Sequence, residues 1–184
     1  MSKVDRRIIK SQEAIKKAFI ELMAEKNVDQ ISIQEISDRA NVSRRTIYLH
    51  YMDKFDLLDK IIEEHIYELR KLCELAVNNT EYNDVVLLWF EYFENHYLFF
   101  STMLASKGGP LFRSRFLEFV LQELENEETI TEGRSQGLSD SEDVIIQFYG
   151  AAILGVVEWW FKNGKPHPPH FMAQRVGTLL EKCL

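Results

Sequence analysis

A chain of 184 residues is long enough for one large domain, or for a small domain joined to a medium one. Its 46% hydrophobic and 28% charged residues fit an ordinary folded protein and exclude intrinsic disorder. Residues 1–60 carry 12 Lys and Arg against 10 Asp and Glu, whereas the whole chain has a net charge of −7, so only the N-terminal third is suited to face a polyanion.

Several functional classes find no support in the sequence. The first residues are charged throughout, unlike a secretory signal, and Cys73 and Cys183 show no metal-binding or disulfide spacing. We therefore expect a cytoplasmic protein with reduced thiols. A P-loop, a nucleophile elbow, a dinucleotide fingerprint and a zinc-protease helix are all missing from the sequence, so we expect no cofactor and no enzymatic activity. His167 and His170 flank two prolines without a matching cluster of ligands, and we expect no metal site there.

The predicted elements are helices throughout. The first has Ile8, Ile15, Phe19 and Leu22 on one face, and a break at 27–30 follows it. Ser32 and Glu35 then form a capping box for a short helix, 33–40. Ser43 caps the next helix, which we expect to run from Arg44 to about Tyr51.

Asp53 is expected to cap a long helix, with a core-facing stripe that includes Phe55, Leu58 and Ile62. After a break at 78–80, an aromatic stretch predicts two helices over 85–103 with a bend near 95–97. Gly and Pro at 108–110 precede a further helix. We expect the polar segment 125–143 to be a loop over part of its length. Prolines at 168–169 open the last helix.

The segment 144–161 is apolar almost all round. A membrane span is one interpretation, but Gln147 and Glu158 within it and acidic residues before it argue against insertion. We expect a helix buried on one side in its own core and on the other against a second subunit, with Gly150, Ala151 and Gly155 allowing close approach. The dimer interface is predicted to include Ala151, Leu154, Gly155, Trp159, Phe171 and Arg175.

The segment from Ser32 to Tyr51 has the order helix, short turn, helix, in which the second helix enters the major groove of DNA. Small and apolar residues such as Ile36, Ala40 and Ile47 suit the crossing of the two helices. The residues expected to point outward, and so to be available to DNA, are Arg44, Arg45, Thr46, Tyr48, His50 and Tyr51. Tyr48 could instead pack in the core, and the charged and histidine side chains could simply be solvated.

The run ISIQEISDRANVSRRTIYLHYMDKFDLL resembles the DNA-binding domain of the TetR/AcrR family of transcriptional regulators. Asn41 stands where that family usually has Gly, which is acceptable because Asn also adopts a left-handed turn. The resemblance implies an all-α fold. It has a homeodomain-like helix-turn-helix head, residues 1–52, and a C-terminal helical regulatory and dimerisation domain, residues 53–184.

The resemblance also implies roles for individual residues. Residues 43–46 would lie at base edges, with Arg to guanine as the strongest sequence-specific contact. Tyr48 and Lys54 would contact the phosphate backbone, and Lys3, Arg6 and Arg7 could add flanking phosphate contacts. The full predicted DNA-binding set is Ser32, Ser43, Arg44, Arg45, Thr46, Tyr48, His50, Tyr51 and Lys54.

The family's C-terminal domain forms a homodimer and usually encloses a small-molecule pocket. Aromatic walls with a few polar tips would suit a small hydrophobic or aromatic effector, although such a stripe also fits a plain core. The predicted pocket residues are Trp89, Phe93, His96, Phe100, Met103, Phe116 and Tyr149.

The function expected from these features is a homodimeric repressor that binds a pseudo-palindromic operator and is released by the effector. The alternative is a TetR-like coactivator or corepressor that binds other proteins and has no operator of its own. The intact Arg44, Arg45, Tyr48 and Lys54 favour the first.

Overall fold

The structure is a computed structural model, and it describes residues 3–76, 82–104, 109–126 and 139–183. Every regular element in these ranges is helical. The predicted break at 78–80 and most of the predicted polar segment 125–143 lie outside the described residues.

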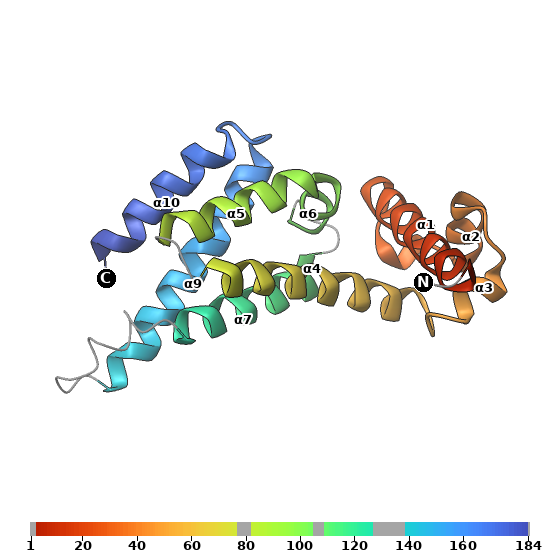
Figure 1. Cartoon of the computed structure of the whole chain (residues 1–184), viewed down its shortest axis with the longest axis horizontal. Coiled ribbons are helices and arrows are strands. Elements are labelled where there is room, and N and C mark those ends of the chain that lie inside the picture. The colour runs from red at the N-terminus through yellow and green to blue at the C-terminus, as the bar shows by residue number, and fades with distance from the viewer. Residues whose placement is uncertain (1–2, 77–81, 105–108, 127–138, 184) are drawn as a thin grey trace.

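Three helices form a small unit at one end of the molecule, which we call the head (Figure 1). They are α1 (Lys3–Glu25), α2 (Ile33–Ala40) and α3 (Arg44–Tyr48), with a 3₁₀ turn at Val28–Gln30 before α2. Ile15, Phe19 and Leu22 of α1 are buried as predicted, but Ile8 is exposed, so the first two turns of α1 reach beyond the core. α3 is also shorter than the predicted helix, although the backbone continues in helical hydrogen bonds to Tyr51.

The helix α4 (Lys54–Ala76) leaves the head and runs along the helices that follow it in the chain (Figure 1). We call these later helices the body. Asp53 begins it, because its carboxylate accepts the backbone N–H groups of Phe55 and Asp56 at 2.8 and 2.9 Å. Leu58 and Ile62 are buried as predicted, whereas Phe55 is about half exposed.

The body consists of helices packed against α4 and against one another. They are α5 (Tyr82–Asn95), α6 (Tyr97–Leu104), α7 (Gly109–Asn126), α9 (Ser139–Lys162) and α10 (Pro169–Cys183). The predicted bend at 95–97 is confirmed, because α5 ends and α6 begins there. α10 packs along α5, α7 packs against α9, and both α5 and α7 contact α4. α6 also contacts α1, so the body touches the head at a second place besides α4.

The segment Val144–Lys162 of α9 is long and apolar enough to span a membrane, but half of it is buried inside the chain's own fold. Trp160 and Val157, for example, lie in the core. The packing of α9 against α6 and α7 therefore accounts for much of its hydrophobicity.

Candidate DNA-binding surface

The N-terminus of α2 is fixed by the predicted capping box. The Ser32 hydroxyl accepts the backbone N–H of Glu35 at 3.3 Å, and the Glu35 carboxylate accepts the backbone N–H of Ser32 at 2.9 Å. The ammonium of Lys26, followed by the backbone and hydroxyl of Ser32, lowers the pKa of Glu35 to about 2. Since the Ser32 hydroxyl also donates to Glu35, it is already hydrogen-bonded within the cap.

The turn between α2 and α3 is built around Asn41. Its φ of 53° and ψ of 44° lie in the left-handed region, as expected for the residue that replaces Gly in the motif. Ser37, buried in α2, donates from its hydroxyl to the carbonyl of Val42 at 2.6 Å, and the N–H of Val42 bonds back to the carbonyl of Ser37. Ser43 then caps α3 by accepting the N–H of Thr46 at 3.1 Å. This tightly bonded turn sets the angle at which α3 leaves α2.

The outer face of α3 carries the predicted DNA contacts Arg44, Arg45 and Tyr48, all exposed. Neither guanidinium has a hydrogen bond or an ion pair within the described part of the chain. The opposite face is anchored by Ile47, which is fully buried, while Thr46 and His50 are half-buried at the sides. Two unpaired cations and an aromatic ring on a helix held by its other face can contact a nucleic-acid groove.

The expectation that Tyr51 points outward is wrong. Its side chain is only 3% exposed, and burial, together with the carboxylates of Glu64 and Asp56, raises its pKa to about 12. Tyr51 lies one helical turn after the buried Ile47 and therefore shares its inward direction.

Lys54, predicted to contact phosphate, has a partner inside the head. Its ammonium donates to the carbonyls of Asp29 and Ile31 at 2.7 and 2.9 Å. Further along α4, Lys60 donates to the carbonyl of His50 at 3.0 Å. Both lysines therefore attach the first turns of α4 to the head, whereas the predicted domain boundary lies before α4, between residues 52 and 53.

A groove beside the turn is lined by basic side chains. Arg6, Arg7 and Lys10 from α1, with Ser11, Ala14 and Val42, surround a volume of about 480 Å³. Val42 belongs to the α2–α3 turn, so these cations lie next to the start of α3. Arg6 and Arg7 were predicted to flank the DNA site, whereas the side chain of Lys3 lies outside the described residues.

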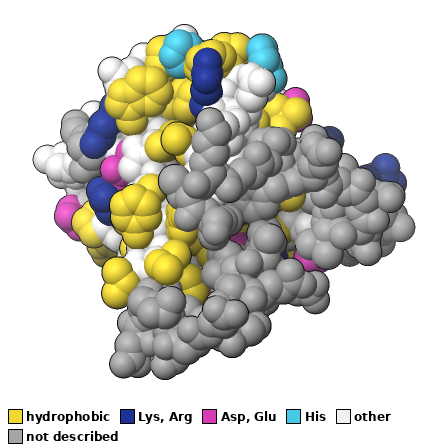
Figure 2. All heavy atoms as spheres, turned by 90° about the vertical axis from the view of Figure 1, so that its left-hand side faces the viewer, with side chains coloured by type: hydrophobic (Ala, Val, Ile, Leu, Met, Phe, Trp, Pro, Cys, Tyr) yellow, Lys and Arg dark blue, Asp and Glu magenta, His cyan; other side chains and the backbone are white. Residues whose placement is uncertain are grey.

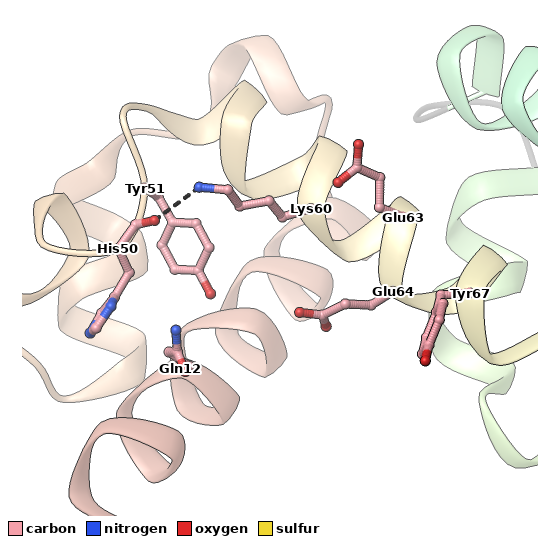
Figure 3. Close-up of a pocket in the computed structure, with 7 residues that line it drawn as sticks. All are labelled: Gln12, His50, Tyr51, Lys60, Glu63, Glu64 and Tyr67. Atoms are coloured by element: carbon pink, nitrogen blue, oxygen red, sulfur yellow. Dashed lines mark hydrogen bonds between the residues drawn. The ribbon is translucent and has the colours of Figure 1, made fainter. Parts of the chain in front are cut away.

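A second cleft of about 370 Å³ lies between α1 and α4, where Figure 3 shows Lys60 reaching toward the carbonyl of His50. Gln12 from α1 and Glu64 from α4 line opposite sides of it, and Tyr51 lies between them (Figure 3). Glu64 also pairs with Lys16 of α1 at 2.5 Å. This cleft is the place where α4 leaves the head.

The surface of the head also exposes apolar side chains outside the set predicted to contact DNA. Leu49 is 70% and Met52 80% exposed, and they lie just beyond α3 near the half-exposed Phe55. Leu49 follows the buried Ile47 by two residues, so a helical backbone turns its side chain away from the core. This position could have predicted the exposure of Leu49 from the sequence.

The predicted pocket residues of the body pack closely on one another. The ring centroids of Phe93 lie 4.8 Å from Phe100 and 6.0 Å from Phe116. Trp89, Met103 and Tyr149 are buried as well, whereas His96 is exposed and its ring lies against Tyr92. The described side chains thus form an aromatic core, in which the indole N–H of Trp89 is buried and has no acceptor among them.

The predicted dimer residues do not all lie on one surface. Leu154 is buried in the chain's own core, and a Cβ on Gly150 would come within 2.6 Å of Leu121 in α7, so Gly150 serves packing within the chain. Expecting a subunit contact at these two positions was wrong, because α7 covers that side of α9.

On the other side of α9, several residues are not covered by any described part of the chain. Ala151, Gly155 and Trp159 are exposed together with Phe148, which is 65% exposed, and a Cβ on Gly155 would meet nothing within 4 Å. On α10, Phe171 is half-buried, and Arg175 and Leu179 are exposed. Figure 2 views the end of the molecule where α10 finishes and α9 begins, and hydrophobic side chains gather on the described part of that face.

A helical head with a capped helix-turn-helix and an unpaired basic outer face, joined to a helical body, defines a DNA-binding regulator. Family models agree over most of the chain: residues 15–61 match the bacterial regulatory proteins of the tetR family, and residues 80–182 match a transcriptional regulator C-terminal region. The chain belongs to the TetR family of transcriptional regulators.

Individual relatives are distant. An uncharacterized HTH-type transcriptional regulator of Bacillus subtilis, YxbF, is 24% identical over 97% of this chain and 46% of its own length. The dhaKLM operon transcriptional activator DhaS of Lactococcus lactis is 28% identical over 52% of this chain and 49% of its own length. The chain thus spans about half the length of these curated relatives. A TetR transcriptional regulator structure from Streptococcus agalactiae is 25% identical and covers 96% of both chains, with a TM-score of 0.71.

Proposed function

We propose that the protein is a homodimeric repressor in the cytoplasm, and that it binds a pseudo-palindromic operator through α3. The observation that carries this proposal is the outer face of α3, where Arg44 and Arg45 are exposed and unpaired within the described part of the chain. An unpaired guanidinium on a helix that enters the major groove can bond the O6 and N7 atoms of a guanine. The cations of the groove beside the turn, Arg6, Arg7 and Lys10, would add phosphate contacts.

A second copy of the chain would cover the open side of α9 and α10. Its apolar stripe of Phe148, Ala151, Gly155 and Trp159 suits a self-complementary contact between two identical helices. Two heads would then lie on one face of the duplex, each in a major groove.

An effector would act by favouring one spacing of the two heads over another. Its candidate site is the aromatic core of the body, where the unpaired N–H of Trp89 would bond an acceptor atom on an otherwise hydrophobic molecule. Because the rings around it are in contact with one another, binding would have to separate them, and α4 would carry the change to the head.

Activation is a second candidate direction of control, favoured by the relative DhaS, whose name is that of an operon activator. Transcription with purified RNA polymerase from a promoter that carries the operator separates the two. A repressor lowers the amount of transcript as protein is added, and an activator raises it.

Binding of wild type and Arg45→Ala to operator and random duplexes, measured by fluorescence anisotropy, tests the DNA-binding proposal. We expect Arg45→Ala to weaken operator binding by at least about tenfold, because a bidentate contact to guanine is lost in each half-site, and to weaken random binding much less. Lys17→Ala, which removes an exposed positive charge from α1, is the matched control. Equal losses on both duplexes for Arg45→Ala would contradict base recognition. A protein with no operator preference would point to the alternative, a module that binds other proteins.

A further inference from the structure

On α3 and its C-cap, two residues lie almost opposite the buried Ile47, namely Arg45 and Leu49. Successive residues of an α-helix are turned by about 100°, so relative to the buried Ile47 at zero, Arg45 lies at about 160° and Leu49 at about 200°. Leu49 keeps helical backbone angles, with φ −70° and ψ −23°, and its N–H bonds to the carbonyl of Arg45. The same helical positions put Arg44 and Tyr48 on one side of this direction, and Thr46 and His50 on the other.

Leu49 is exposed to an unusual degree for its surroundings. Its side chain is 70% in solvent, although Ile47 and Tyr51 on the same helical segment are almost fully buried. Single exposed leucines are common on protein surfaces. Here, however, Tyr48 and Met52, close to the leucine in sequence, are exposed as well, and Arg45, one helical turn before it, has an unpaired guanidinium within the described part of the chain.

We propose that Leu49 contacts the C5-methyl group of a thymine in each operator half-site, next to the guanine bonded by Arg45. This inference rests on the proposed function, because it assumes that α3 lies in the major groove. There the thymine methyl is the one apolar group that a base pair presents, and apolar side chains recognise it. Since Arg45 and Leu49 are one helical turn apart, a guanine and a nearby thymine fall within reach of the same helix face.

The test replaces thymine by deoxyuridine, which lacks only the methyl group. The full-length protein first selects its preferred duplex from random sequence, and each thymine of that duplex is then replaced in turn. We expect wild type to lose about fourfold in affinity at one thymine in each half-site, the value of burying one methyl-sized group. Leu49→Ala removes the contact in both half-sites of the dimer, so it should bind the parent duplex about sixteenfold more weakly, and should show no further loss at either thymine.

Two controls make the result specific. Met52→Ala removes the neighbouring exposed side chain and should keep the wild-type loss at the same thymine. Because Leu49 is mostly exposed, Leu49→Ala should fold normally, which equal binding of wild type and variant to a random duplex at low salt would verify. The same deoxyuridine losses in Leu49→Ala as in wild type, or no loss in wild type at any thymine, would overturn the inference. Failure of the wild type to select any sequence would instead overturn the proposed function, and this inference with it.

Discussion

Lys54 and Tyr51 show how single residues of a DNA-binding motif divide between folding and recognition. The motif groups them with the DNA-facing side chains, but Tyr51 is buried and Lys54 bonds two backbone carbonyls of the head. Hydrogen bonds from a charged donor typically contribute about 1.5–3 kcal/mol, so Lys54 contributes to the stability of the head. The sequence could not separate these roles, since the partners of Lys54 are carbonyls 23 and 25 residues away.

His65 is a second residue whose role depends on contacts that the sequence does not reveal. It lies on α4, where its Nδ1 and the Tyr92 hydroxyl are 2.7 Å apart and its ring stacks on Phe99 with centroids 3.9 Å apart. Burial, with smaller effects from His96 and Lys16, lowers the pKa of His65 to about 3. The folded protein therefore holds this imidazole neutral between helices α4, α5 and α6.

This burial predicts a pH dependence of stability. The unfolded chain binds a proton at His65 near pH 6.5, whereas the folded chain binds it only near pH 3. The contribution of His65 to the free energy of unfolding is therefore fully present above pH 6.5 and is lost as the pH falls below it. Between pH 6.5 and 5.5, we expect the free energy of unfolding to fall by as much as about 1 kcal/mol from this group. Urea unfolding of wild type and His65→Phe at fixed protein concentration measures the effect.

The His65→Phe variant should show a smaller decline than wild type over that range. Some decline should remain, because desolvation of its ring beside Tyr92 and His65 also lowers the pKa of His96. His170→Phe, at an exposed position on α10, should behave like wild type. An unchanged decline in His65→Phe would contradict the assignment.

At the scale of elements, local signals in the sequence predicted most helix ends in the head. The capping box at Ser32, the cap at Ser43 and the carboxylate of Asp53 all form as expected, because each depends on residues two or three positions away. The side of α9 that meets α7 was not predictable in this way. Both Gly150 and Gly155 looked suited to a close helix contact, and only the packing of α7 distinguishes them.

The left-handed turn at Asn41 allows a direct test of the helix-turn-helix geometry. We expect Asn41→Gly to keep or slightly raise the free energy of unfolding, and Asn41→Val to lower it by at least about 1 kcal/mol, because a β-branched residue is strained at positive φ. Thermal or urea unfolding measures both variants.

Asn27→Val is the matched control for this turn, since Asn27 is exposed and its φ of −65° and ψ of 147° are extended backbone. It should cost much less than Asn41→Val. Equal effects at the two positions would mean that the left-handed geometry is not what selects Asn41.

In the whole molecule, α4 and the contact between α1 and α6 both connect the head to the body. Lys54, Lys60 and Glu64 attach the first part of α4 to the head, while Asp59 pairs with Arg115 of α7 and His65 packs against α5 and α6. α1 also contacts α6. A change in the body can therefore reach the head through α4 and through the contact between α1 and α6.

The proposed dimer predicts the effect of a substitution on the open side of α9. Gly155→Arg should fold as a monomer of about 21.7 kDa, because a side chain there meets open space within the chain but would block a second copy. Wild type should sediment at twice that mass. The loss of dimerisation should also lower the affinity of Gly155→Arg for the operator, since one head alone contacts one half-site.

Glu118→Arg, on the exposed surface of α7, is the control for added charge and size and should remain dimeric. Circular dichroism should show the same helix content in all three proteins. A Gly155→Arg protein that sediments like wild type would place the subunit contact elsewhere on the molecule.

Paired copies of α3 should recognise a repeated DNA sequence, and the sharpest test is selection of duplexes from random sequence by the full-length protein. We expect enrichment of an inverted repeat whose half-sites are centred about one helical turn of DNA apart, roughly 10 base pairs, or a multiple of that distance. Each half-site should contain a guanine whose replacement weakens binding of wild type but not of Arg45→Ala. Enrichment of no sequence, or of a single motif without a repeat, would contradict operator recognition by a dimer.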